Sequence, residues 1–131
     1  MPLVRVLIVE DFLPFRQFVC STLGKDPQLE VVGEASDGLE AVQKAEELKP
    51  DLILLDIGLP SLNGIDAART IRIISPASKI IFLSQESSSD VIQEALNRGA
   101  SAYVVKMRAE SDLLTAIGAV LSGKQFVSCI S

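Results

Sequence analysis

Five polar residues stand at the ends of apolar runs in this sequence, and their types could together do chemistry. Glu10 and Asp11 come directly after one run, and Asp56 ends another. Ser84 and Lys106 follow two further runs. If these side chains meet in the folded protein, they supply three carboxylates, one hydroxyl and one ammonium group.

Three carboxylates in one pocket predict a metal site. They repel one another, and they do not all stay ionised without a cation. Oxygen ligands that include a few carboxylates and waters favour Mg²⁺. Asp56 would then act as a carboxylate nucleophile and form an aspartyl phosphate. Lys106 would face the phosphoryl charge, and Ser84 would donate its hydroxyl to a phosphoryl oxygen.

Five short apolar runs alternate with segments of helical periodicity. Residues 3–9, 52–55 and 80–83 are almost continuously apolar, which is typical of strands that are covered on both faces of a parallel sheet. Residues 29–35 and 102–105 complete the predicted strands. The order is (βα)5, and right-handed crossovers then predict an α/β fold, a doubly wound five-stranded parallel sheet with helices on both faces.

Helix signals occur between the predicted strands and after the last one. Pro14 suits a helix start and Gly24 a helix end. Asp37, with Glu40 three residues later, resembles a capping box that opens a second helix. Three further helices are predicted at residues 65–74, 91–97 and 113–121.

The strand order decides whether the polar residues meet. Ligands of open α/β sheets bind outside the carboxyl ends of the strands, where the strand order reverses. In the flavodoxin-like order 2-1-3-4-5, the first and third strands are neighbours at that point, so Glu10, Asp11 and Asp56 converge. Each residue alone has an ordinary interpretation as a strand end, a helix start or a loop residue. Five of them at four strand ends favour a functional site.

Composition narrows the class of function. The 131 residues suit one domain, and 48% of them are hydrophobic, which is enough for a sizeable core. A net charge of −5 argues against direct binding of DNA or of an anionic membrane. We find no membrane span and no signal peptide, and Cys20 and Cys129 lie outside any metal-binding spacing. We therefore expect a cytoplasmic protein with reduced thiols. The chain has no histidine, which excludes histidine ligands and an internal phosphohistidine.

Several motifs together resemble the receiver domains of two-component response regulators. They are Val-Leu-Ile-Val-Glu-Asp at residues 6–11, the segment 50–60 with the Asn63-Gly64 pair, Phe-Leu-Ser at residues 82–84, and the segment 99–106. The resemblance covers nearly the whole chain. It gives residues 1–123 as the receiver domain and residues 124–131 as a tail or the start of a linker.

The resemblance implies a phosphorylation site with a Mg²⁺ cofactor. Asp56 is the implied phosphoacceptor, and a histidine kinase is the implied phosphodonor. Asp11, Asp56 and the backbone carbonyl of Gly58 are the implied direct ligands of the metal, and Glu10 is implied to act through water. Such a receiver is a signalling module rather than an enzyme.

Further roles carried by the resemblance concern the switch and the output. Lys106 is the implied phosphate-binding lysine, and Ser84 with Tyr103 is the implied switch pair, which changes a protein–protein surface. The segment Leu113 to Val127 resembles receivers attached to LuxR-type helix-turn-helix output domains. The parent protein would then regulate transcription and reach DNA only through that domain. A stand-alone receiver is the alternative, and homodimer formation is left open.

Three residues depart from the usual pattern of the family. Glu10 stands where aspartate is commoner, Gln85 follows Ser84 where a small residue is usual, and Met107 follows Lys106 where proline is usual. Gln85 would restrict access to the phosphoryl site. A cis bond before a residue other than proline costs about 2.5–4 kcal/mol, so we expect the Lys106–Met107 bond to be trans.

Three other interpretations compete with a phosphorylated receiver. A Mg²⁺-dependent phosphatase with an aspartyl intermediate usually has a second acid two residues after the nucleophile, where this chain has Gly58. A flavodoxin-like flavin protein needs a phosphate-binding loop after the first strand, and Glu10 and Asp11 are electrostatically wrong for it. A receiver that never accepts phosphate is the third, but every catalytic position is filled.

Overall fold

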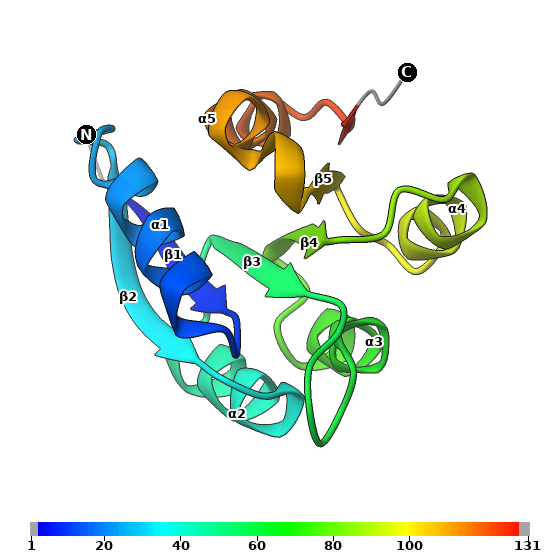
Figure 1. Cartoon of the computed structure of the whole chain (residues 1–131). Helices are drawn as coiled ribbons and strands as arrows, with labels where there is room; N and C mark the ends of the chain where they lie inside the picture. The colour runs from blue at the N-terminus through cyan, green and yellow to red at the C-terminus, as the bar shows by residue number, and fades with distance from the viewer. Residues whose placement is uncertain (1–2, 129–131) are drawn as a thin grey trace.

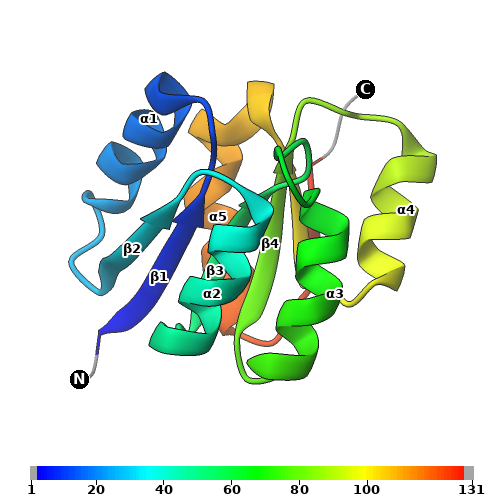
Figure 2. The same cartoon turned by 90° about the horizontal axis from the view of Figure 1, so that it is seen from below.

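Six parallel strands form one sheet that carries helices on both faces (Figures 1 and 2). The structure, a computed structural model, describes residues 3–128. The strand order is β2-β1-β3-β4-β5-β6, so the predicted order of the first five strands is confirmed. The strands are β1 (Val4–Val9), β2 (Leu29–Ala35), β3 (Leu52–Asp56), β4 (Lys79–Ser84), β5 (Ala102–Val105) and β6 (Phe126–Val127).

The sixth strand corrects the prediction of a five-stranded sheet. β6 lies within the segment predicted as a tail or linker, and it pairs in parallel with β5 through Ala102 with Phe126 and Tyr103 with Val127. Two residues are too short for a periodic pattern to be read from the sequence. The strand is fixed by a side chain that follows it, because Ser128 Oγ accepts the backbone N–H of Val105 at 3.1 Å. Cys129 lies outside the described residues.

Helices form two layers, one on each face of the sheet (Figure 1). Two helices pack on one face together with the even-numbered residues of β1, and three helices pack on the other face with the odd-numbered ones. No helix among residues 3–128 is long and apolar enough to cross a membrane. The helices are α1 (Leu13–Leu23) and α5 (Ala109–Leu121) on the first face, and α2 (Gly38–Leu48), α3 (Gly64–Ile74) and α4 (Ser89–Asn97) on the second.

Local capping explains where the helices begin. Pro14 stands in the first turn of α1, as predicted. Asp37 caps α2 by accepting the N–H of Glu40 at 2.8 Å, and the Glu40 carboxylate accepts the N–H of Ser36 at 2.8 Å. The predicted capping box is thus present, with its return bond displaced by one residue. Asn63 caps α3, which begins at Gly64, one residue before the start of the predicted helix at residues 65–74.

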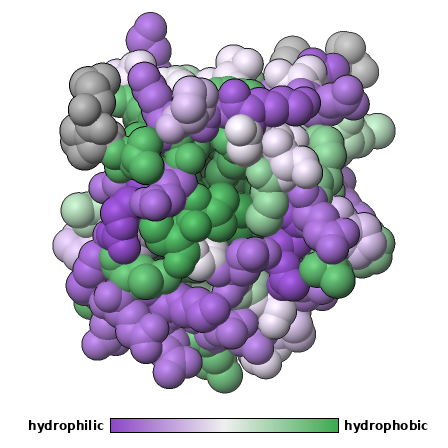
Figure 3. Space-filling view, turned by 90° about the vertical axis from the view of Figure 1, so that its left-hand side faces the viewer, coloured by the Kyte–Doolittle hydropathy of each residue, from purple (hydrophilic) through white to green (hydrophobic). Residues whose placement is uncertain are grey.

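One edge of the sheet is formed by β2, whose apolar surface is only partly covered. Val31 and Val32 are half-buried, while Glu30 and Glu34 are exposed. Figure 3 shows an apolar area on this side of the molecule, surrounded by hydrophilic surface. The register between β1 and β2 shifts at this point, since Val6 pairs with Val31 and the next residue pairs with Gly33. Charges and an irregular register both oppose the addition of another strand at an open edge.

Candidate functional site

Strand register brings the predicted site residues to one end of the sheet. Val9 pairs with Leu55, so the residues that follow β1 lie beside the end of β3. Ser84 pairs with Val105, which places the end of β4 beside the start of the segment that follows β5. A pocket at this end is lined by Glu10, Asp11, Asp56, Gly58, Ser84 and Lys106, together with Phe12, Phe15, Ile57, Gln85, Glu86 and Met107.

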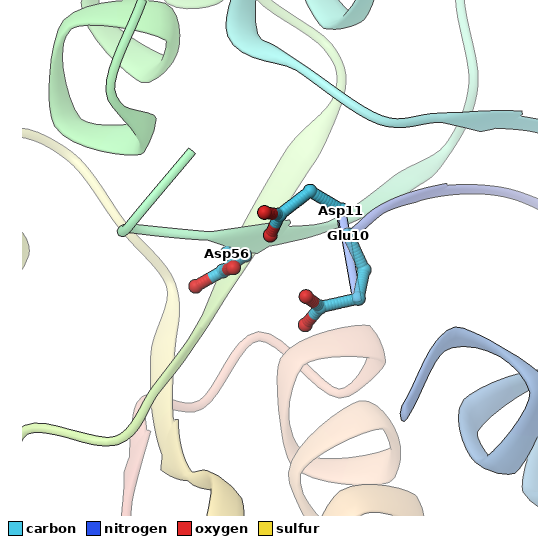
Figure 4. Close-up of side chains that lie close together, drawn as sticks. All are labelled: Glu10, Asp11 and Asp56. Carbon is cyan, nitrogen blue, oxygen red and sulfur yellow. The ribbon is translucent and has the colours of Figure 1, made fainter. Parts of the chain in front are cut away.

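Three carboxylates face a common space in this pocket (Figure 4). Glu10 and Asp11 follow β1, and Asp56 ends β3. One oxygen from each of them lies within 4.8 Å of the others. Glu10 and Asp56 are buried and Asp11 is exposed, so the cluster opens to solvent on the side of Asp11. The predicted convergence of these residues is therefore confirmed.

Glu10 is the most deeply buried member of the cluster, with no exposed surface. Its Oε2 accepts the backbone N–H of Phe12 at 3.0 Å, and its Oε1 lies 2.6 Å from Lys106 Nζ. Burial raises the pKa of the Glu10 carboxyl, while the bonds from Lys106 and Phe12 act in the opposite direction. Glu10 consequently holds the lysine at the inner end of the pocket.

Asp56 lies between a backbone donor and the same lysine. Its Oδ1 accepts the N–H of Gly58 at 3.1 Å, and its Oδ2 is 3.4 Å from Lys106 Nζ. The chain returns very close to it at the start of α3, where a Cβ on Gly64 would lie 2.2 Å from the Asp56 carbonyl oxygen. Only glycine fits that approach, which accounts for the Asn63-Gly64 pair in the motif.

Lys106 reaches the pocket from a short 3-10 helix, η1 (Lys106–Arg108), that follows β5 directly. Residues 3–128 contain no cis peptide bond, so the predicted trans bond between Lys106 and Met107 is confirmed. Besides its two carboxylate partners, Lys106 Nζ lies over the ring of Phe15, 4.8 Å from the ring centre. The Lys106 side chain thus reaches the acidic pocket although the peptide bond that follows it is trans.

The predicted switch residues are joined through one backbone segment. Ser84 Oγ accepts the N–H of Glu86 at 3.0 Å, and the Tyr103 hydroxyl donates to the Glu86 carbonyl at 2.9 Å. Tyr103 is fully buried, so its ring already points inward. Burial raises the pKa of the Tyr103 phenol, and the neighbouring Ser84 opposes that rise. A movement of the Ser84 hydroxyl would therefore change the position of the Glu86 backbone, and with it the hydrogen bond of the Tyr103 hydroxyl.

Phe15 is a pocket residue that the sequence did not reveal. Its spacing with Phe18 and Val19 predicts a buried helix face, and Phe15 does pack partly against the core. It also lies in the first turn of α1, close behind the acidic pair in the chain. Helix starts after β1 lie at the carboxyl end of the sheet, and this position is the signal that could have identified it.

A family comparison agrees with this geometry. Residues 6–118 match the model of the response regulator receiver domain. The chain belongs to this family. It is therefore a receiver domain of the kind found in two-component response regulators.

Individual relatives include a short chemotaxis protein and longer regulators. The chain is 40% identical to chemotaxis protein CheY of Thermotoga maritima over 88% of this chain and 96% of that protein. It is 34% identical to the nitrate/nitrite response regulator protein NarL of Escherichia coli over 94% of this chain and 57% of NarL. A crystal structure of a LuxR-family two-component response regulator from Aurantimonas matches with a TM-score of 0.90 and 32% identity, covering 95% of this chain and 89% of that one. The chain spans about half the length of several curated relatives that it matches.

Proposed function

We propose that this receiver accepts a phosphoryl group from a histidine kinase on Asp56, in a Mg²⁺-dependent site, and thereby switches a protein–protein surface. The observation that carries the proposal is the position of Asp56 within the pocket. Its carboxylate lies in a cluster of three acids, and Lys106 Nζ is 3.4 Å from its Oδ2. A nucleophile, a cation and an excess of carboxylates are the parts that phosphoryl transfer needs.

In the transfer step, an oxygen of Asp56 forms a bond to phosphorus. The bond from phosphorus to the imidazole nitrogen of the kinase phosphohistidine breaks, and that nitrogen keeps the electron pair. The Lys106 ammonium faces the charge of the transferred group, which it reaches by shifting from Glu10. Ser84 donates its hydroxyl to another phosphoryl oxygen, in keeping with its buried position at the end of β4. Positioning and charge neutralisation are thus the chain's own contributions.

The acidic cluster fits a divalent cation. Three carboxylates and one lysine leave an excess of negative charge in a pocket that is open to solvent at Asp11. The atoms that would bind a metal are carboxylate oxygens, which are the ligands that Mg²⁺ prefers. Asp11, Asp56 and the Gly58 carbonyl would hold Mg²⁺ directly. Glu10 would act through water, since both of its oxygens already have partners. The bound ion would neutralise charge on the transferred group.

The switch would pass from Ser84 to Tyr103 through the backbone of Glu86. When the Ser84 hydroxyl turns to a phosphoryl oxygen, the N–H of Glu86 loses the acceptor that it has at 3.0 Å. The segment between β4 and α4 then moves, and with it the Glu86 carbonyl that accepts the Tyr103 hydroxyl. We expect the change to spread over β4, α4, β5 and α5, which makes a protein–protein surface the output.

The surface would control a LuxR-type DNA-binding domain beyond the end of this sequence. The likeness to the Aurantimonas LuxR-family regulator and to the longer NarL protein supports this reading. A stand-alone receiver is the second candidate, supported by the match to nearly the whole of CheY. The sequence that follows Ser131 in the gene distinguishes the two.

Intact mass tests the phosphoacceptor. The protein is incubated with Mg²⁺ and acetyl phosphate, from which Asp56 takes the phosphoryl group while acetate leaves with the electron pair of the broken bond. Wild type should gain one phosphoryl group, and Asp56→Asn should gain none. Equal labelling of the Asn variant would overturn the assignment, and Asp51→Asn, at the opposite end of β3, serves as the matched control.

A further inference from the structure

An aromatic ring lies against the lysine at the proposed phosphorylation site. Lys106 Nζ is 4.8 Å from the centre of the Phe15 ring and lies over its face. The negative face of an aromatic ring attracts an ammonium group within about 6 Å. We propose that Phe15 is a positioning residue, whose ring holds the Lys106 ammonium in the acidic pocket and so raises the rate at which Asp56 accepts a phosphoryl group. The rate effect rests on the proposed function, whereas the contact itself does not.

The ring is held in place from several directions. Phe15 packs partly against the buried layer under α1, and its ring lies 5.7 Å from that of Phe18 at an angle of 33°. The next residue, Arg16, donates from Nη1 to the Glu10 carbonyl at 3.1 Å. The first turn of α1 is thereby tied to the chain that carries the acidic pair. A ring so fixed is a preorganised partner for the lysine.

The lysine needs a partner of this kind because its backbone does little to aim it. Its side chain is a flexible four-carbon stem that ends in a point charge. The residue that follows, Met107, is 83% exposed. The Lys106 side chain is nevertheless only 14% exposed, and a cation–π attraction strengthens as the cation loses water. The ring therefore contributes most in the partly buried position that the lysine occupies.

The distances also show why two carboxylates are not enough. Lys106 Nζ is nearer to Glu10 Oε1, at 2.6 Å, than to Asp56 Oδ2, at 3.4 Å. To meet a phosphoryl group on Asp56, the ammonium has to leave its closest partner. A ring face attracts a cation over a broad range of positions, so Phe15 retains the ammonium during that shift. Without the ring, we expect the ammonium to stay with Glu10, which is its nearer carboxylate partner.

Fluorinated phenylalanines at position 15 test the proposal with little change in shape. Fluorine withdraws electron density from the ring face, so 4-fluoro-, 3,5-difluoro- and 3,4,5-trifluorophenylalanine attract a cation progressively less. The rate constant for phosphorylation by acetyl phosphate at saturating Mg²⁺ should fall stepwise, by about two- to fivefold over the series. A flat series would overturn the proposal.

Phe18 provides the matched control, because it belongs to the same helix and the same ring pair. The same three fluorinated residues at position 18 should leave the phosphorylation rate unchanged. An equal decrease in both series would mean that the ring pair acts through packing, which would refute a cation–π role for Phe15. Thermal melts of all variants identify any rate change that comes from lost stability.

A second readout does not depend on phosphorylation. A ring face above the lysine should move the NMR signals of the Lys106 ε-methylene protons upfield, and Phe15→Leu should abolish that displacement. Phe18→Leu should retain it. No displacement in the wild type would overturn the contact. If the displacement is present but Asp56 takes up no phosphoryl group, the proposed function fails while the placement of Lys106 by Phe15 stands.

Discussion

Buried carboxylates occur at two places in this molecule, and their surroundings differ in kind. Asp112, in the first turn of α5, accepts the Ser128 hydroxyl at 2.8 Å and the Ser111 hydroxyl at 3.3 Å. Arg108 Nε lies 3.4 Å from it. Ser128 in turn accepts the N–H of Val105, so one acid joins α5, the end of β5 and the chain after β6. Every group in this arrangement has a partner, which is the condition for a stabilising buried network.

The acidic pocket has the opposite balance. Glu10 has a backbone donor and a lysine, but Asp11 and Asp56 share its space, and the Lys106 ammonium is divided between Glu10 and Asp56. Like charges that lack enough counter-charge destabilise the fold. The contrast teaches that burial of an acid does not identify a functional site. An excess of acids over donors is the better guide to a candidate site, because a bound cation would relieve the repulsion.

The largest effect on stability should come from the balanced site. Asp112→Ala removes a charged acceptor from Ser128 and Arg108 and should lower the free energy of unfolding by about 1.5–3 kcal/mol. Urea denaturation measures this change. Phosphorylation by acetyl phosphate should persist at a denaturant concentration where the variant is folded. A stability loss below about 0.5 kcal/mol would show that Asp112 does not fix the C-terminal segment.

Magnesium should stabilise the unbalanced site by a smaller amount. A ligand that binds only the native state adds about 1.4 kcal/mol at roughly ten times its Kd. Thermal melts in millimolar Mg²⁺ and in a chelator should therefore differ for the wild type. Asp11→Asn should lose the difference and Asp112→Asn should keep it. The same Mg²⁺ effect in both variants would contradict a metal site at the acidic cluster.

Without a divalent cation, neutralising one member of the cluster should stabilise the fold. Asp11→Asn relieves repulsion with Glu10 and Asp56, whose oxygens lie within 4.8 Å. Because Asp11 is exposed, solvent screening keeps the gain below about 1 kcal/mol. Urea denaturation in a chelator measures it. A loss of stability in this variant would mean that Asp11 has an uncounted favourable partner, and the contrast with Asp112 would fail.

Much of the site could be predicted from the sequence because the sheet itself aligns the residues. Long apolar runs fix which segments become central parallel strands, and the ends of those strands then meet at one edge. Glu10, Asp11, Asp56, Ser84 and Lys106 needed no finer knowledge than that. Helix starts such as Asp37 were readable for a similar reason, since a capping bond spans only three residues.

What could not be predicted depends on side chains that meet across long stretches of chain. The strand Phe126–Val127 is specified by Ser128 and by the distant Asp112, a pairing that no local pattern encodes. The position of Phe15 over Lys106 depends on how α1 packs against β1 and α5. Hydrophobic periodicity gives the face that Phe15 buries, but it does not give the neighbour at the edge of that face.

The smallest expected effect is a pH dependence that sets Glu10 apart from a fully satisfied acid. Its pKa is raised in the folded protein, chiefly by burial. Above the ordinary pKa of a glutamate, about 4.3, the folded state therefore binds more protons than the unfolded chain until the raised pKa is passed. The free energy of unfolding contributed by Glu10 falls as the pH rises through that interval and is constant above it. The Glu10→Gln variant lacks this ionisation. Its free energy of unfolding relative to the wild type should therefore increase as the pH rises through this interval. Urea denaturation of both proteins in a chelator measures the difference. A difference that stays flat with pH would show that Lys106 and the Phe12 N–H fully offset the burial of this carboxylate.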